Sequence, residues 1–209
     1  AQLSWNSYDD NAWIYPERFG DFFLSNDSTA GESLYKDDAA INLAEGLTPT
    51  SSASIGDTQY ITDGIANLAD KYSYSEVAGP QWIQYDLGAE CEINAVKLWH
   101  YYGDGRTYKD VIVQLSNDAE FDDGNTMTVF NNDKDNSAAQ GIGIDAEYAE
   151  NNKGKLIRFN TVKNARYIRL WTNGSSVNDY HRYTEVQVLY GNVPEEKSEG
   201  PVNLVAGII

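Results

Sequence analysis

The chain has 209 residues, of which 41% are hydrophobic and 12% aromatic, and its formal net charge is −17. This length and apolar content suffice for one domain with a packed core, which excludes wholesale disorder. The negative charge repels phosphate backbones and anionic lipids, which argues against nucleic acid and membranes as partners. It also disfavours polyanionic sugars, unless Arg106, Lys109 and Arg182 gather locally. The single cysteine, Cys91, excludes an internal disulfide.

Residues 1–41 differ in pattern from the rest of the chain. The stretch PERFGDFFL predicts a short helix that begins at Pro16, and SNDSTAGES predicts a loop or linker. The aromatic residues of this region make it too apolar for a free tail. We interpret residues 1–41 as an N-terminal extension or the end of a preceding module.

Residues 42–191 consist of short alternations of apolar and polar residues, divided by turn residues. In QWIQYDLG, for example, Ile83, Tyr85 and Leu87 fall on one face. Such period-two runs predict half-buried antiparallel strands. Similar runs occur in INAVKLW, DVIVQLS, MTVF, KLIRF, ARYIRLW and TEVQVLYG. Their number and spacing predict an all-β fold, a β-sandwich of about eight antiparallel strands, with a jelly roll as the expected topology.

Residues 192–209 begin with NVPEEKSEGP, a polar stretch with Pro and Gly that predicts a linker. The stretch NLVAGI, at 203–208, then repeats the spacing of Asn, Leu and Gly in NLAEGL, at 42–47. We interpret residues 192–209 as a linker and the start of a possible second module. A chance match of six residues is the alternative.

The stretch LWHYYGDGRTY is the first candidate for a binding loop. Sugar recognition needs flat apolar rings for C–H surfaces and a few fixed polar groups for hydroxyls. Tyr102 and Tyr108 offer rings, His100 offers a polar group, and Arg106 offers a rigid fork of donors. The alternative is structural: aromatic residues of the loop fill the core, and Arg106 pairs with Asp104.

Two further stretches are candidates for the same site. NGSSVNDYHRYTE joins the last two predicted strands and offers the rings of Tyr180 and His181, with Asn178 as a hydrogen-bonding partner. YSYSE offers Glu76 as an acceptor for sugar hydroxyls. The alternative for the first stretch is an ordinary polar hairpin loop.

The order and spacing of these blocks resemble a known family. NLAEGLTPTSSAS, ITDGIANLADKYSY, QWIQYDLGAECEINAVKLW, YKDVIVQLSND, ARYIRLWTNGS and TEVQVLYG together resemble F5/8 type C (discoidin) domains. Within that family, the chain is most similar to bacterial family 32 carbohydrate-binding modules. The resemblance covers residues 42–191 and leaves residues 1–41 unexplained.

The resemblance implies a discoidin-like, galactose-binding-domain-like jelly roll of eight strands whose sugar site lies in loops at one end. In the resembled modules, a residue at the position of His100 contacts sugar, and an aromatic residue in the last loop often packs against the sugar ring. The family is non-catalytic and usually accompanies a glycoside hydrolase or polysaccharide lyase. It often carries a structural calcium ion near the start of the fold.

Acidic residues suited to calcium are present. Calcium favours hard oxygen ligands from a bent loop that a distant carboxylate completes; Asp63 precedes a glycine in TDG, and Asp70 follows after a short loop. The resemblance maps the usual ligands onto Asp63 and Glu185, whereas Asp70 falls near a position more often held by threonine or serine. The alternative is a capped turn with surface acids.

The stretch NNDKDNSAAQG imitates the alternating oxygens of an EF-hand calcium loop. It lacks the glycine at the sixth position and the closing glutamate at the twelfth. We therefore interpret it as a solvated loop of Asx turns.

Taken together, the sequence predicts a bacterial carbohydrate-binding module without enzyme activity of its own, located outside the cell or at the cell surface. The expected partners are a neutral glycan or polysaccharide and neighbouring modules of the same polypeptide, with no nucleic acid and no membrane. The first alternative is a jelly-roll polysaccharide lyase or glycosidase domain that uses His100, Tyr102 and Arg106. The second is a protein-binding discoidin domain.

Overall fold

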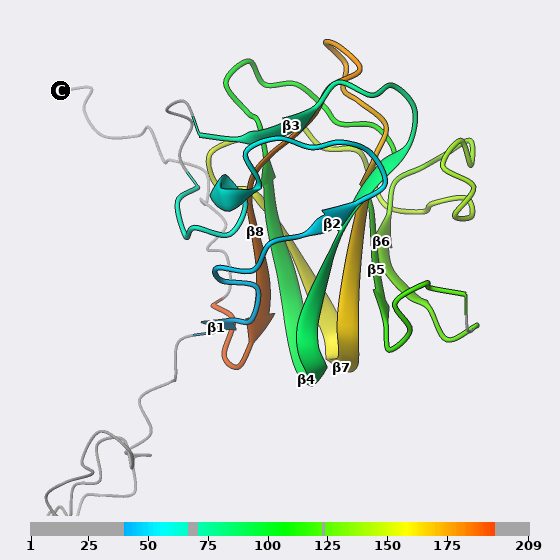
Figure 1. Ribbon diagram of the computed structural model, residues 1–209. Helices are drawn as coiled ribbons and strands as arrows, with labels where there is room; N and C mark the ends of the chain where they lie inside the picture. The colour runs from blue at the N-terminus through cyan, green and yellow to red at the C-terminus, as the bar shows by residue number, and fades with distance from the viewer. Residues whose placement is uncertain (1–39, 67–70, 123, 195–209) are drawn as a thin grey trace, which may run out of the picture. The chain divides into compact units, whose positions relative to one another are not determined.

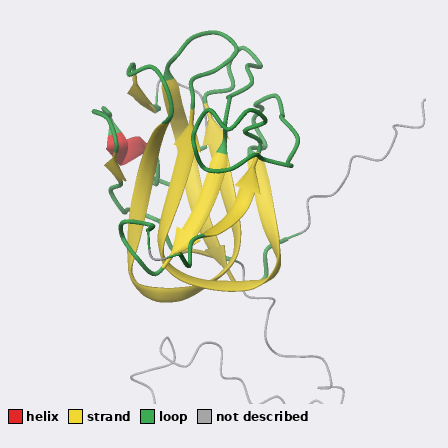
Figure 2. Ribbon diagram, turned by 90° about the vertical axis from the view of Figure 1, so that its right-hand side faces the viewer, coloured by secondary structure: helices red, strands yellow, loops and turns green. Residues whose placement is uncertain are grey.

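The computed structural model describes residues 40–66, 71–122 and 124–194, which belong to the second of two units into which the chain divides, residues 39–209. The described part contains eight strands and one short 3-10 helix (Figures 1 and 2). In chain order these elements are β1 (Ile41–Asn42), β2 (Thr50–Ser51), η4 (Thr58–Tyr60), β3 (Ser73–Ser75), β4 (Gln81–His100), β5 (Ile112–Ser116), β6 (Met127–Asn131), β7 (Lys155–Thr172) and β8 (His181–Tyr190).

Two long strands, β4 and β7, determine the architecture. They pair with each other in antiparallel register from Gln81↔Thr172 to Leu98↔Lys155. Both strands bend midway, so this ribbon turns back on itself, as Figure 2 shows at the lower edge of the sheet. The first half of β4 and the second half of β7 form one layer with β2, β5 and β6, and the other halves form the second layer with β8, β1 and β3. This arrangement confirms the predicted sandwich of about eight antiparallel strands.

The sequence pattern predicts two strands where the structure has the single strand β4. The bend lies between Asp86 and Cys91, where the pairing with β7 shifts register and Gly88 adopts a positive φ of 84°. Glycine adopts this left-handed conformation without steric cost, which suits Gly88 to the bend. A second register shift, between Ile93 and Ala95, places both Ile93 and Val96 in the core despite their odd spacing.

The core lies between the two layers. One layer contributes Ile83, Tyr85, Val113, Leu115, Ile168 and Leu170. The other contributes Val96, Leu98, Ile157, Val186 and Val188 to the same cluster. All of these side chains are nearly or fully buried, so their transfer from water is the main source of the fold's stability.

One end of the sandwich gathers the loops that the sequence analysis singles out. The start of β4 pairs with the end of β7, and the end of β4 pairs with the start of β8. Thr172, at the end of β7, and His181, at the start of β8, are joined by a side-chain hydrogen bond of 2.7 Å. The segments that follow β4 and β7 therefore lie at the same end, at the top of Figure 1, and β3 crosses above β8 there.

The turn before β7 packs tightly against the second layer. Gly154 has a φ of 72°, and a Cβ atom at this position would overlap the indole ring of the buried Trp99. We expect Gly154→Ala to lower the free energy of unfolding by about 2–3 kcal/mol, because it combines a strained φ with overpacking. Gly88→Ala is the matched control, because Gly88 also has a positive φ but open space around its Cβ direction. It should cost about 1 kcal/mol in the same denaturant titration; equal losses would contradict the predicted overlap with Trp99.

Two predictions about the ends of the chain fall outside the described residues. The helix at Pro16, with the rest of residues 1–39, lies in the part that the structure does not describe, and so does the repeated NLVAGI stretch. At the boundary between them and the sandwich, β1 begins at Ile41, which pairs with Tyr190 of β8. The division at 41/42 and the linker from residue 192 onward remain predictions.

Candidate functional site in the end loops

The two loops at the top of the sandwich, residues 101–111 and 173–180, are joined along their backbones. Lys109 and Asn173 are linked by a hydrogen bond of 2.8 Å, and Ser176 donates to the carbonyl of Thr107 at 2.8 Å. Tyr108 and Ser175 form an isolated β-bridge. These backbone bonds hold side chains from two distant parts of the sequence in one place.

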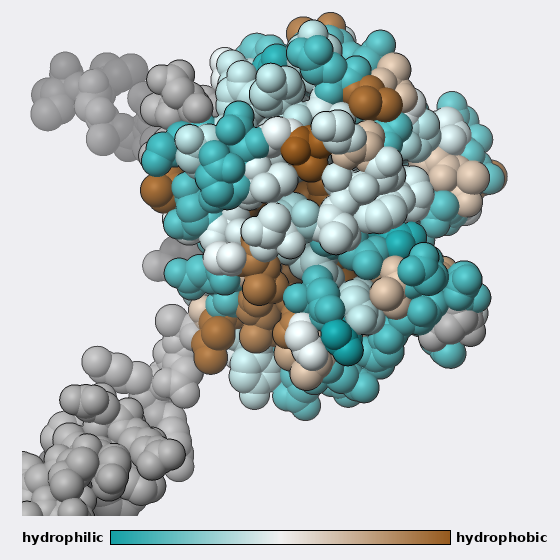
Figure 3. All heavy atoms as spheres, in the orientation of Figure 1, coloured by the Kyte–Doolittle hydropathy of each residue, from teal (hydrophilic) through white to brown (hydrophobic). Residues whose placement is uncertain are grey.

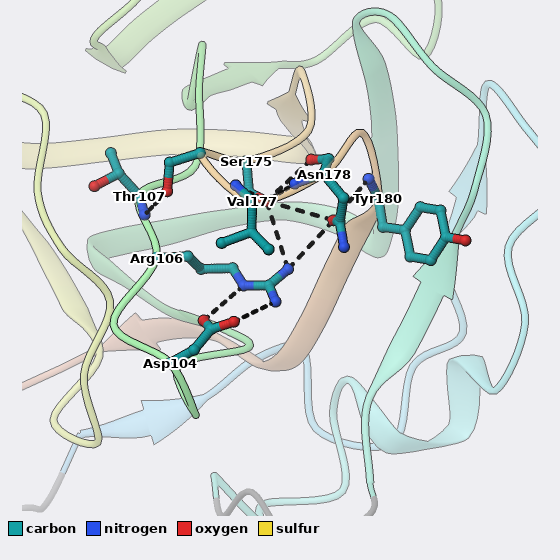
Figure 4. Close-up of polar contacts among 8 residues, drawn as sticks. Asp104, Arg106, Thr107, Ser175, Val177, Asn178 and Tyr180 are labelled. Carbon is teal, nitrogen blue, oxygen red and sulfur yellow. Dashed lines mark hydrogen bonds and ion pairs between the residues drawn. The ribbon is translucent and has the colours of Figure 1, made fainter.

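Arg106 connects the side chains of these loops (Figure 4). Its Nε and Nη2 donate to the two carboxylate oxygens of Asp104 at 2.8 and 2.6 Å, and its Nη1 reaches Asn178 Oδ1 at 3.3 Å and Ser175 Oγ at 3.4 Å. The guanidinium hydrogen bond lowers the pKa of Asp104. Only about 3% of the Arg106 side chain is exposed, so it is the base of the site rather than its surface. The predicted alternative of an Arg106–Asp104 pair is therefore present, as part of a larger network.

Polar groups and rings with accessible surface lie around this base. The side-chain oxygen of Asn178 accepts one hydrogen bond from Arg106 and another, of 3.2 Å, from the backbone N–H of Tyr180. This arrangement orients the amide, whose nitrogen makes no hydrogen bond within the described part of the chain. The Tyr101 ring lies 4.9 Å from the Arg106 guanidinium carbon. Tyr72 packs edge-on against Tyr101, with ring centroids 5.4 Å apart.

Tyr102, Glu76 and Tyr180 are the other accessible residues among those predicted for the site. The Tyr102 hydroxyl donates to the carbonyl of Ala66 at 3.0 Å, which fixes its ring. Glu76 is exposed and raises the pKa of Tyr180, first through its charge and then through a hydrogen bond. The structure thus brings Asn178, Tyr180 and Glu76 to one end of the molecule, as the sequence predicts.

His100 and Tyr108 lie beneath the site. Both are buried, and their rings stack at a centroid distance of 4.4 Å. His100 Nδ1 lies 2.7 Å from Oε1 of the buried Glu150, and its ring is tilted against Tyr183 at 4.9 Å. A covered side chain offers no surface to a ligand, so in this arrangement His100 and Tyr108 support the loops from below.

His181 is also buried, and both of its ring nitrogens are engaged. Nδ1 bonds to Thr172 and Nε2 lies 2.9 Å from the carbonyl of Val77. Desolvation by burial lowers its pKa, so the ring is held neutral. Its position fixes the segment after β3 against the start of β8. Among the predicted site residues, direct contact with sugar therefore remains a prediction for the accessible ones: Glu76, Tyr102, Asn178 and Tyr180.

Further along β8, Glu185 carries a buried carboxylate. Glu185 is fully buried, and neither of its carboxylate oxygens has a hydrogen-bond partner in the described residues. Burial, and secondarily the charge of Asp63, raise its pKa to about 8. A buried carboxylate without a partner is costly, and a cation between it and Asp63 would compensate its charge. These two residues therefore fit the implied calcium ion, whereas the third predicted ligand, Asp70, lies outside the described residues.

A second acidic group combines Asp110, at the end of the loop before β5, with two aspartates of the loop after β6. One carboxylate oxygen from each of Asp110, Asp133 and Asp135 lies within 4.8 Å of the others, a geometry that could hold a metal ion. The expected Asx turns are present, since Asp133 accepts backbone hydrogen bonds from Asp135, Ser137 and Ala138. Asp133 is nevertheless buried rather than solvated. Its backbone bonds account for its burial without an ion.

These features define the class of the molecule. A two-layer jelly roll whose polar and aromatic side chains gather in the loops at one end is a binding domain of the galactose-binding-like class. Residues 60–170, more than half of the chain, match the F5/8 type C family model described as "NedA-like, galactose-binding domain". The chain belongs to this family, which confirms the resemblance. No curated protein matches it.

Solved structures agree with this assignment. The "CBM32 of AlyQ in complex with 4,5-unsaturated mannuronic acid" is 25% identical with a TM-score of 0.51, and the match covers 70% of this chain and 96% of that one. A "truncated AlyQ with CBM32 and alginate lyase domains" is also 25% identical, with a TM-score of 0.52, and the match covers 70% of this chain and 32% of that one. The family 32 module of NanJ from C. perfringens, solved with galactose, has a TM-score of 0.52 over 72% of this chain and 98% of that one, and its 16% identity shows the shared fold alone. The chain is thus related to carbohydrate-binding modules.

Proposed function

We propose that this chain is a non-catalytic glycan-binding module and that it binds sugar at the end loops around Arg106. The observation that carries the proposal is the Arg106 network, which joins Asp104, Ser175 and Asn178 from two loops (Figure 4). The half-buried ring of Tyr101 lies 4.9 Å from the guanidinium of this network. Rings that cover C–H faces and a preorganised set of polar groups are what a sugar site requires.

The accessible groups have complementary roles in this proposal. The Asp104 carboxylate accepts from sugar hydroxyls and the Asn178 amide nitrogen donates to them. The rings of Tyr101 and Tyr180 cover the apolar face of the sugar. Because such a shallow site buries little area, the dissociation constant for a monosaccharide should be on the order of 0.1–1 mM.

We infer that the module serves a larger bacterial protein that acts outside the cell or at its surface. A structure of AlyQ with both CBM32 and alginate lyase domains shows that such modules accompany enzymes, which supports this inference. Weak sites in neighbouring modules would then act together through avidity. Within the described residues, the structure contains no helix that is long and apolar enough to span a membrane.

The two alternatives have less support. A lyase that used His100 as its base would need this side chain at the surface, but it is buried against Glu150. A protein-binding domain would favour a contiguous apolar patch. On the face of the molecule in Figure 3, apolar residues form separate small patches among hydrophilic ones.

A glycan array with calcium present tests the proposal. We expect the parent protein to bind at least one polysaccharide, and Tyr180→Ala to weaken this binding by about three- to tenfold through loss of the ring contact. Tyr190→Ala is the matched control, because Tyr190 is 39% exposed at the far end of β8. Equal losses in both variants, or binding to no glycan, would overturn the proposed site. Release of reducing ends or of unsaturated uronates by the pure protein would contradict a non-catalytic role.

A further inference from the structure

Arg182 lies beside the proposed site, on β8, between three tyrosine rings. Its guanidinium carbon is 5.1 Å from the ring centroid of Tyr72, 5.3 Å from that of Tyr101 and 5.3 Å from that of Tyr180. The residue and all three rings are half-buried. We call this group the tyrosine cage. It adjoins the Arg106 network, because Tyr101 also contacts the Arg106 guanidinium.

The Arg182 side chain has no hydrogen-bond partner within the described part of the chain. Its Nε is buried and unpartnered, and its guanidinium forms no ion pair with a described carboxylate. Rings stabilise a guanidinium through their faces, but they leave its N–H donors, which lie in its plane, unused. A cation held in this way is oriented for an acceptor that the described residues do not supply.

The other described arginines differ from Arg182 in this respect. Arg106 and Arg166 each donate two hydrogen bonds to one carboxylate, from Asp104 and Asp86 respectively. Arg158 donates to backbone carbonyls, and Arg169 donates to the Gln84 side chain and to carbonyls. Arg182 alone among the described arginines donates no hydrogen bond to a described residue, and it lies next to a surface that the proposed function assigns to glycan.

We propose that Arg182 binds a carboxylate group of the glycan, so that the module selects an acidic sugar, a uronic acid or a sialic acid. This inference rests on the proposed function and deepens it. Arginine matches the planar carboxylate with two parallel N–H donors, and an apolar surround strengthens such a pair. The exposed Glu76 lies beside the cage, where its charge raises the pKa of Tyr180, but it forms no ion pair with Arg182.

The inference departs from the expectation of a neutral glycan for a local reason. That expectation rests on the net charge of −17 of the whole chain. Exposed charges more than about 10 Å away are largely screened at physiological salt, so the ligand responds mainly to groups within the site. There the charge of Arg106 is compensated by Asp104, and that of Arg182 is not.

Calorimetric titration with matched ligands tests the inference. A uronate oligosaccharide and a sialylated oligosaccharide are each compared with the same molecule after reduction of its carboxyl groups to alcohols. We expect the parent to bind at least one acidic form about tenfold more tightly than its reduced form, with a preference that shrinks in high salt. Arg182→Gln should abolish this preference and leave the affinity for the reduced form within about twofold. The control Arg166→Gln removes an exposed arginine from a different strand, β7, and should keep the preference.

The outcomes separate this inference from the proposed function. If the parent binds the reduced glycans as tightly as the acidic ones, or if Arg182→Gln retains the preference, the inference is wrong and glycan binding stands. If the parent binds neither these ligands nor any glycan on the array, the proposed function fails and the inference fails with it.

Discussion

Removal of calcium is expected to lower the melting temperature of this protein by about 5–10 °C. Glu185 is buried without a hydrogen-bond partner and faces the charge of Asp63, so the ion that we propose between them would bind the native state alone. At a calcium concentration one hundred times its dissociation constant, such binding adds about 2.7 kcal/mol of stability. For a domain of this size, each kcal/mol corresponds to about 2–4 °C. Thermal unfolding in calcium and in excess chelator measures the difference.

The variant Glu185→Gln makes this prediction specific to the site, because its effect should change sign. In chelator at neutral pH, the Glu185 carboxyl must take up a proton on folding or remain charged while buried, because burial raises its pKa to about 8. A neutral amide avoids this cost and should raise the melting temperature. In saturating calcium it removes a ligand and should lower the melting temperature. Glu90→Gln, at an exposed position, should shift neither value. The same shift for Glu185→Gln in both conditions would show that no ion binds there.

The second large effect is expected for Arg106→Ala. This change leaves Asn178 and Ser175 without their shared donor and frees the loop that carries Asp104, so the preorganised site is lost. Loss of such polar contacts typically costs about 1–3 kcal/mol, which is roughly a five- to 150-fold weaker affinity for glycan. Starting from a dissociation constant on the order of 0.1–1 mM, the variant's dissociation constant should rise to the order of 1–100 mM. Calorimetric titration with a glycan that the array identifies provides the measurement.

Arg166→Ala is a close chemical control for Arg106→Ala. Arg166 also makes a bidentate pair with an aspartate, Asp86, but this pair is exposed and lies next to the bend of β4 and β7. Its loss should leave glycan affinity unchanged. The Arg106→Ala protein should still unfold cooperatively, because the loop lies outside the core cluster. Unchanged affinity in a folded Arg106→Ala protein would remove Arg106 from the site.

The fold could be predicted from the sequence because the alternation of apolar residues reports directly which side chains face the core. Ile83 and Tyr85 are buried on one face of β4, as the period of two requires. The pattern could not show that β4 continues through its bend, because a register shift at Gly88 breaks the period locally without ending the strand. The pattern also could not show that Glu185, which faces away from the core, is buried, because the segment around Ile61 pairs with Val186 beside it.

The site was less predictable, because residue type reports chemistry but not accessibility. The side chain of His100 is chemically suited to bind a ligand, but it is buried between the rings of Tyr108 and Tyr183. The pairing of β4 with β8 shifts register between Trp99 and His100. No signal in the sequence marks that irregularity. The tyrosine cage was missed for a different reason: it needs the pairing of β3 with β8, which brings Tyr72 near Arg182 from more than a hundred residues away.

The most direct test of the central claim is an NMR titration of the isotope-labelled protein with a glycan identified by the array, in the presence of calcium. A ligand at the end loops should perturb the amide signals of residues 101–110 and 173–182 and of the segment around Tyr72. Signals from the bend of β4 and β7, near Gly88, should stay unchanged, because that bend is at the opposite end of the sandwich (Figure 1). Perturbations confined to another surface, such as the outer face that carries Trp82 and Trp171, would contradict the account.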